Sequence, residues 1–189
     1  KVYAYVFSNA PASSALYGRF SAHCPVRLDE AAMDRAARAL VGRHDFTAFQ
    51  AAGGTAKTFV REMKAARVAR RGNLVTFLIY GTGFLYNMVR ICAGTLALVG
   101  QGKLPEDCFA QAYATRSRLS LGYTAPAKGL TLVRVLYPGQ EAQGEALAGM
   151  DALFGGADAA EFLPDGPELL PPKPLDLTEK PLDGEENLR

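Results

Sequence analysis

The sequence FVREMKAARVARRGNLVTFLIYG, residues 59–81, contains two runs with strand character on either side of Gly72 and Asn73. A Gly-Asn pair between two such runs is typical of a tight hairpin turn, and we therefore predict a β-hairpin. The second run, 74–80, is apolar on both faces, so its strand should be central and buried. A helical period also fits residues 59–71 and is the alternative for the first run.

The segments around the hairpin predict the other elements. Residues 1–8 are β-branched and aromatic and predict a strand. Asp29 is a suitable N-cap for a helix over 30–41, and Gly42 is expected to close that helix. The remaining expected elements are a short helical turn at 45–52, helices at 84–99 and 105–115, with Pro105 in the first turn of the latter, and a strand at 129–137.

The resulting order, β-α-β-β-α-α-β, predicts an α+β fold with the split βαβ, or ferredoxin-like, arrangement. Its antiparallel or mixed sheet would have helices packed on one face. The other face would stay free, and RNA-binding modules of this topology use such a face. One domain is expected over residues 1–138, and residues 139–189 are an acidic, proline-rich tail that we expect to be partly helical or disordered.

Charge is divided unequally along the chain. Residues 1–138 carry 18 Lys and Arg against 7 Asp and Glu, a net charge of +11, whereas residues 139–189 carry 3 against 12, a net charge of −9. A domain with such a positive charge attracts polyanions, and a solvated acidic tail does not cancel that charge locally. Nucleic acid or an anionic surface is therefore the leading class of partner.

Cysteine content and hydropathy favour a cytoplasmic protein. Cys24, Cys92 and Cys108 are odd in number and far apart, so reduced thiols are expected rather than disulfides or a metal site. The longest apolar run, 84–99, contains polar residues and is too short to cross a bilayer, so no membrane partner is expected. The chain starts at Lys1 without a leader sequence, and we interpret it as a fragment that begins inside a strand.

Arg90 is the most informative single residue because it is the only charged residue between Arg71 and Lys103. A buried guanidinium is costly unless a carboxylate pairs with it, so Arg90 is a candidate for orienting an acidic catalytic group. Most of the few acidic residues before the tail lie near helix starts or on the basic hairpin, so we expect the partner outside this chain. The alternative is an arginine that extends from the helix edge into solvent.

A basic strip lies on and just before the hairpin. It consists of Lys57, Arg61, Lys64, Arg67, Arg70 and Arg71. Such closely spaced cations can follow a phosphate backbone, and only Glu62 interrupts them among charged residues. The alternative is a solvated strand whose charges protect a sheet edge, but the net charge of the domain makes us favour RNA contact.

Tyr3 and Tyr5 fall on the same face of the first strand because side chains alternate there. Such a pair can stack on a nucleobase, although two core tyrosines are the more common case. Gly81 and Gly83 before a helix suggest a dinucleotide site, but Tyr86 stands where the third glycine is needed, so we reject that motif.

Four segments in the same order resemble the tRNA pseudouridine synthase A family. They are YAY at 3–5, GRHDFTAF at 42–49, GTGFLYNMVRI at 81–91 with GTL at 94–96 and VG at 99–100, and TAPAKGLTLVRVLY at 124–137. Together they cover about residues 1–138. The ordered set is specific, although no single segment would be.

The resemblance implies an isomerase that converts uridine to pseudouridine in the tRNA anticodon stem-loop, at positions 38 to 40, without a cofactor. In the family an aspartate attacks the target nucleotide, and the base detaches, turns and rejoins through C5. Arg90 occupies the place of the arginine that pairs with this aspartate. Tyr3 occupies the place of the tyrosine that stacks on the base and is proposed to take the C5 proton.

Further contacts and partners are also expected. Phe84, in the longest matching segment, is expected to bind substrate together with Tyr3 and the strip residues Lys57, Arg61, Lys64, Arg67 and Arg70. The expected partners are tRNA and a second copy of the chain, as a homodimer.

The family's Arg-Thr-Asp-x-Gly-Val-His motif, which contains the nucleophilic aspartate, does not occur in this sequence. We therefore expect the C-terminal half of such an enzyme, inactive by itself. The alternative is a non-catalytic RNA-binding module whose parent lacks the nucleophile, and a third interpretation is a structural dimerisation domain. The acidic tail extends beyond the usual end of the family, and no function is assigned to it.

Overall fold

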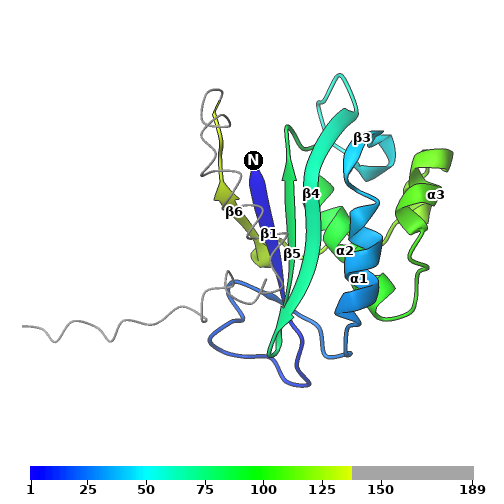
Figure 1. Ribbon diagram of the computed structural model, residues 1–189. Coiled ribbons are helices and arrows are strands. Elements are labelled where there is room, and N and C mark those ends of the chain that lie inside the picture. Colours follow the sequence, from blue (N-terminus) through cyan, green and yellow to red (C-terminus); the bar gives the residue numbers. More distant parts are fainter. Residues whose placement is uncertain (138–189) are drawn as a thin grey trace, which may run out of the picture.

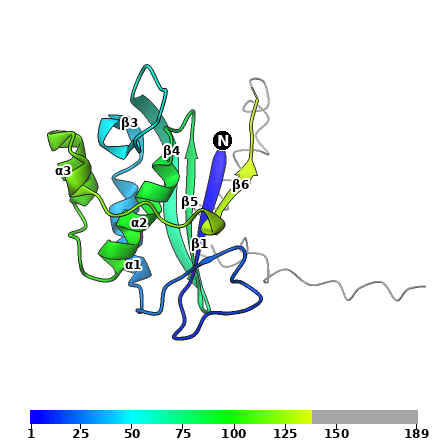
Figure 2. The ribbon, with the colours of Figure 1, turned by 180° about the vertical axis from the view of Figure 1, so that it is seen from behind.

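The computed structural model describes residues 1–137 of the 189-residue chain. A six-stranded sheet forms one layer, and the helices form a second layer on one face of it (Figure 1). The strands are β1 (Val2–Ser8), β2 (Ala22–His23), β3 (Gly42–Asp45), β4 (Val60–Arg71), β5 (Leu74–Gly81) and β6 (Leu130–Arg134). The helices are α1 (Glu30–Arg38), α2 (Met88–Gly100) and α3 (Cys108–Thr115). Seen from behind, the three helices again lie together on one side of the sheet (Figure 2).

The sheet is mixed, with the strand order β2-β1-β5-β4-β3 and with β6 also paired to β1. All neighbouring strands are antiparallel except β2, which is parallel to β1. β2 and β6 share one edge of β1, because β2 pairs with its end at Phe7 and Ser8 and β6 pairs with its beginning. The expected α+β class, with helices packed on one face of a mixed sheet, is confirmed.

The predicted hairpin is confirmed. β4 and β5 pair from Arg71 and Leu74 outward, and Gly72 in the turn has a φ of +54°, which a residue without a side chain adopts at no steric cost. β5 lies between β1 and β4, and most of its side chains are buried. The strand therefore has the central position that its apolar composition predicts, and the helical alternative for residues 59–71 is wrong.

The core lies between the sheet and the helices. Tyr5, Phe77, Met33, Leu96 and Phe109, from strands and from all three helices, are each completely buried. Burial of each such side chain stabilises the fold by roughly 1.5–3 kcal/mol. This core fixes the beginning of α2 against β1, where the candidate site lies.

Helix α1 closes part of one sheet edge. β3 pairs with β4 only as far as Met63, and beyond that pair the N–H of Val68 donates to Asp34 Oδ1 at 2.8 Å. Arg67 Nε donates to the same oxygen at 2.8 Å. A backbone donor that would otherwise be open on an edge strand is thus satisfied by a helix side chain.

The helices are shorter than the sequence predicts. Asp29 caps α1 as expected, since its Oδ1 accepts from Ala32 N at 2.9 Å. The helix nevertheless ends at Arg38, because the next N–H groups bond to carbonyls three residues back, in a tighter turn. Gly42 does not close the helix but begins β3, with a φ of +111°.

Two other helix starts and the last strand are also corrected. α2 begins at Met88 rather than at residue 84 because Asn87 has a left-handed φ of 58°, which ends any helical run before it. α3 begins at Cys108, so Pro105 lies before the helix and not in its first turn. The last strand stops at Arg134, where its pairing to Val2 ends. The helical turn expected at 45–52 is a single 3₁₀ turn, Thr47–Phe49.

β2 and β3, two short strands at the two edges of the sheet, were not predicted. The order β-α-β-β-α-α-β of the remaining elements is confirmed. The expectation for the acidic tail falls on residues outside the described part of the chain. Within residues 1–137, no helix is long and apolar enough to span a membrane.

Candidate active site

A pocket of about 250 Å³ opens beside the beginning of β1. Its walls come from the start of β1, the loop before α2, the first turn of α2 and the start of β6. The lining residues are Tyr3, Phe84, Leu85, Tyr86, Asn87, Met88, Val89, Arg90 and Leu130. The structure therefore brings together Tyr3, Phe84 and Arg90, which are far apart in sequence or on different elements.

The two tyrosines of β1 have different environments. The ring of Tyr3 lines the pocket and meets Phe84 edge-on, with ring centroids 5.0 Å apart and an interplanar angle of 83°. Its hydroxyl makes no hydrogen bond to any residue of the described chain. Tyr5 is completely buried, its hydroxyl donates to the Pro126 carbonyl at 2.7 Å, and burial raises its pKa. Tyr5 is a core residue, whereas Tyr3 presents a ring and a free hydroxyl to the pocket.

Arg90 is half-buried at the pocket wall and is held by two neutral groups. Its Nε donates to the Ala125 carbonyl at 2.7 Å, and its Nη1 donates to Asn87 Oδ1 at 2.9 Å. Within residues 1–137 no carboxylate pairs with Arg90, and the two N–H groups of Nη2 have no partner. The guanidinium is thus fixed in orientation while part of its hydrogen-bonding capacity stays unused.

The segment that holds Arg90 is itself fixed against α2. Ala125 N donates to the Arg90 carbonyl at 3.0 Å, and Gly122 N donates to Thr95 Oγ1 at 2.9 Å. At Gly94 the Tyr123 carbonyl lies where a side chain would begin. These residues had no predicted role, although a glycine inside an apolar helix is a signal of close packing.

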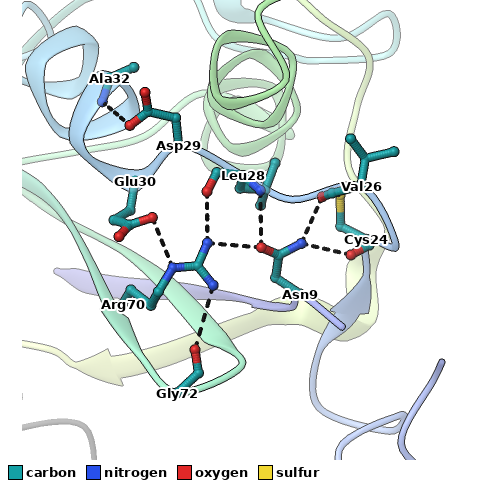
Figure 3. Close-up of polar contacts among 9 residues, drawn as sticks. All are labelled: Asn9, Cys24, Val26, Leu28, Asp29, Glu30, Ala32, Arg70 and Gly72. Atoms are coloured by element: carbon teal, nitrogen blue, oxygen red, sulfur yellow. Dashed lines mark hydrogen bonds and ion pairs between the residues drawn. The ribbon is translucent and has the colours of Figure 1, made fainter. Parts of the chain in front are cut away.

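Arg70 of the basic strip is engaged inside the domain (Figure 3). Its Nε donates to Glu30 at 2.8 Å, and its Nη2 donates to Asn9 Oδ1 at 2.8 Å and to the Leu28 carbonyl at 2.7 Å. Its side chain is only 12% exposed. The same Asn9 side chain donates to the carbonyls of Cys24 and Val26, so Arg70 belongs to a network that joins β4, β1 and the loop before α1.

The rest of the strip does not form one continuous surface. Arg67 reaches around the edge of β4 to Asp34, and Lys64 pairs with Glu62 at 2.6 Å. Lys57 and Arg61 lie at the beginning of the strip, and neither has a carboxylate partner in the described residues. The strip therefore contains two groups of cations. Lys64, Arg67 and Arg70 pair with carboxylates, whereas Lys57 and Arg61, near the start of β4, have no carboxylate partner in the described residues.

Two carboxylates that face the strip are held in their charged form. Partial burial is the largest single influence on the pKa of Glu30 and would raise it. The hydrogen bond and charge of Arg70, together with a backbone hydrogen bond and the charge of Arg27, outweigh burial and lower the pKa. Burial likewise opposes the ionisation of Asp34, but the N–H of Val68 and the guanidinium groups of Arg67 and Arg38 lower its pKa. These charges stabilise the fold and lie away from the pocket lining.

Comparison with known proteins identifies the family. Residues 36–138, more than half of the chain, match the tRNA pseudouridine synthase family. The tRNA pseudouridine synthase A of Acetivibrio thermocellus is 45% identical over 137 residues, which are 72% of this chain and 56% of that protein. The proteins of the same name from Ruminiclostridium cellulolyticum and Syntrophotalea carbinolica are 44% and 45% identical over 138 and 141 residues, covering 72% and 75% of this chain and 56% of each relative.

The chain belongs to the tRNA pseudouridine synthase family, and the resemblance found in the sequence is confirmed. It spans about half the length of the curated relatives it matches. The pocket offers an aromatic surface, a hydroxyl and a guanidinium with free donors, but none of its lining residues is acidic.

Proposed function

We propose that this chain supplies the C-terminal half of a tRNA pseudouridine synthase that isomerises uridine at positions 38 to 40 of the anticodon stem-loop. The observation that carries the proposal is the arrangement around Arg90. Its guanidinium is held by Ala125 and Asn87 in the same pocket as Tyr3 and Phe84, with Nη2 free. Family membership and the positive charge of residues 1–138 support the same reaction and substrate.

In this proposal Arg90 orients the catalytic aspartate. The carboxylate enters from the N-terminal half and accepts hydrogen bonds from the free N–H groups of Nη2. A charge-assisted pair of this kind keeps the aspartate ionised and fixes its direction. Since Nε and Nη1 are already occupied by neutral acceptors, the guanidinium meets the aspartate in one orientation.

The aromatic side chains act on the base. The target uracil stacks on Tyr3, whose own ring is held edge-on by Phe84. The bond between N1 and the ribose breaks, and the base turns and forms a new bond from C5 to the ribose. The C5 proton then passes to the Tyr3 oxygen, which has no competing partner in residues 1–137, as the hydroxyl gives up its own proton. N1 gains one proton, so the net change is the move of one proton from C5 to N1.

Release of tritium from tRNA labelled at uridine C5 tests the proposal. The chain alone should release none, and the chain joined to its upstream sequence should release it steadily. That upstream sequence should contain an Arg-Thr-Asp motif. If the motif is present and the joined protein forms no pseudouridine, the proposal is wrong; if the motif is missing, the chain is instead a non-catalytic RNA-binding module.

We also propose that the protein acts in the cytoplasm as a homodimer, with residues 1–138 as one domain. The three cysteines are buried and unpaired, which suits a reducing compartment. Light scattering of the joined protein tests the dimer, since a single-chain mass at micromolar concentration would contradict it.

A further inference from the structure

A second pocket, of about 460 Å³, lies at the beginning of β4. It is lined by Arg43, Thr58, Val60, Arg61, Glu62 and Thr82. Its polar side chains come from β3, from β4 and the residues before it, and from the segment just after β5. None of these residues lines the first pocket.

Arg61 of the second pocket lies beside Gly83, the residue that precedes Phe84 of the first pocket. The side chain of Arg61 lies against Gly83, with its Cδ 3.4 Å and its Nε 3.5 Å from the place of a β-carbon there. Phe84, the next residue, lines the first pocket. A strand of RNA with one base in the first pocket would therefore bring a neighbouring part of its backbone to Arg61.

The charge of the second pocket is positive. Arg43 is exposed and has no ion pair in the described part of the chain, and Arg61 Nη1 bonds only to the Val60 carbonyl at 2.7 Å and weakly to Thr58 Oγ1 at 3.4 Å. The one carboxylate, Glu62, is paired with Lys64 at 2.6 Å. Arg67 and Arg70, further along β4, have their own carboxylates. Among the described residues of β3 and β4, Arg43 and Arg61 thus carry charges without a carboxylate partner, and both line the second pocket.

We propose that this second pocket binds a backbone phosphate next to the target uridine, through Arg43 and Arg61 with the hydroxyls of Thr58 and Thr82. Arginine and threonine side chains are common donors to phosphate oxygens, and such contacts set the register of the nucleic acid without reading its sequence. The inference rests on the proposed function and adds to it how the uridine is placed over Tyr3.

The test combines protein and RNA changes. The probe is a synthetic anticodon stem-loop RNA in which single phosphates around the target uridine are replaced, one at a time, by uncharged methylphosphonates. Affinity is measured by fluorescence anisotropy with the joined protein. Arg61→Ala should weaken binding about tenfold and reduce the salt slope by about 0.7, as expected for one lost contact to single-stranded RNA.

At one linkage next to the target uridine, the methylphosphonate should weaken binding to wild type but not further weaken binding to Arg61→Ala. Arg43→Ala should give the same pattern at the same linkage. Arg35→Ala is the control, because Arg35 is an exposed arginine of α1 in a pair with Glu106. It should leave affinity unchanged, and circular dichroism should show all three variants folded.

The affinity loss from the methylphosphonate and the loss from the arginine variant could instead multiply at every linkage. That result would overturn the inference and leave the proposed function intact, provided that wild type still forms pseudouridine. An unchanged affinity of Arg61→Ala would have the same consequence. If wild type neither binds the RNA nor forms pseudouridine, the proposed function fails and the inference fails with it.

Discussion

Arg70 and Arg90 are both held between elements distant in sequence, but their partners differ. Arg70 meets the carboxylate of Glu30 at 2.8 Å as well as the side chain of Asn9 and a carbonyl, and is 12% exposed. Within residues 1–137, Arg90 meets only a carbonyl and an amide oxygen. A guanidinium with its own carboxylate and nearly all donors satisfied stabilises the fold, whereas one held by neutral acceptors keeps its charge available to a partner.

The largest effect on activity should come from Tyr3, which lines the same pocket as Arg90. In the joined protein, Tyr3→Phe keeps the ring but removes a hydroxyl without a protein partner in residues 1–137. Pseudouridine formation should fall by about 10²- to 10⁴-fold, the range for loss of a general base, while tRNA affinity stays the same. The matched control is Tyr5→Phe, which loses the bond to the Pro126 carbonyl and about 1 kcal/mol of stability, with little effect on turnover. Normal turnover in Tyr3→Phe would leave Tyr3 a packing role only.

Arg90→Lys should give the next largest effect. Lysine keeps the charge but lacks the planar group that can hold Ala125, Asn87 and a carboxylate at once. We expect turnover to fall about 10²- to 10³-fold, comparable to loss of a preorganised donor, with the free energy of unfolding changed by at most about 1 kcal/mol. Tritium release and urea denaturation measure the two quantities. A variant that unfolds easily but turns over normally when folded would make Arg90 a structural residue like Arg70.

Arg70→Met should have the opposite profile. It removes the side-chain donor of Glu30 and one of the two donors of Asn9 Oδ1, which still accepts from Leu28 N. The free energy of unfolding should fall by about 2–3 kcal/mol, while turnover per folded molecule stays the same. Arg35→Met is the control, since the exposed pair with Glu106 should contribute no more than about 1 kcal/mol. A loss of tRNA affinity in folded Arg70→Met would instead return Arg70 to the RNA-binding surface.

Asn87→Gly should produce a smaller change, about 5- to 10-fold in turnover, because one hydrogen bond that orients Arg90 is lost. Glycine accepts the left-handed φ of 58° at this position, so stability should change little. Asn87→Ala provides the contrast, since it loses the same bond and also strains the backbone. Equal turnover in Asn87→Gly and wild type would show that Ala125 alone is enough to hold Arg90.

The smallest expected effect is the pH dependence of stability, which comes from Glu30, the partner of Arg70, and from Asp34, the partner of Arg67. The pKa values of Glu30 and Asp34 are lowered in the folded chain, so their pairs stabilise it fully above the ordinary carboxyl range near pH 4. That stability should be lost as pH falls from this range through the lowered values. Urea denaturation between pH 7 and pH 3 measures the loss, and Asp34→Asn should reduce its size. Stability that rises on acidification would contradict the assigned direction.

Local signals made most of the fold predictable. Gly72 and Asn73 specify a turn between neighbouring runs, and the apolar composition of β5 specifies its central position. β3 was missed because GRHD is polar and becomes a strand only by pairing with β4, more than fifteen residues later in sequence. The start of α2 was missed because the left-handed conformation of Asn87 is not visible in an apolar run.

The candidate site could be predicted from the sequence where a charged residue is isolated among apolar ones. Arg90 stands out because few charges surround it in sequence, and the carboxylate partner expected for it outside this chain stays a prediction. Arg70 looked like its neighbours in the basic strip, because its partners Glu30 and Asn9 are 40 and 61 residues away. Nor could residue types alone show which of the tyrosines of β1 faces a pocket, since that depends on the loop before α2.

The packing of the Tyr123 carbonyl against Gly94 sets helix propensity against close packing of the backbone. Glycine inside a helix costs about 1 kcal/mol relative to alanine, the residue that a helix of this composition would otherwise favour. A β-carbon at Gly94 would displace the strand of chain that delivers the Ala125 carbonyl to Arg90. Because the obstructing atoms belong to the backbone and not to a flexible side chain, displacing them would cost more than the helical propensity that a substitution adds. Laboratory selection for heat resistance should therefore keep glycine at this position, although glycine is the weaker helix former.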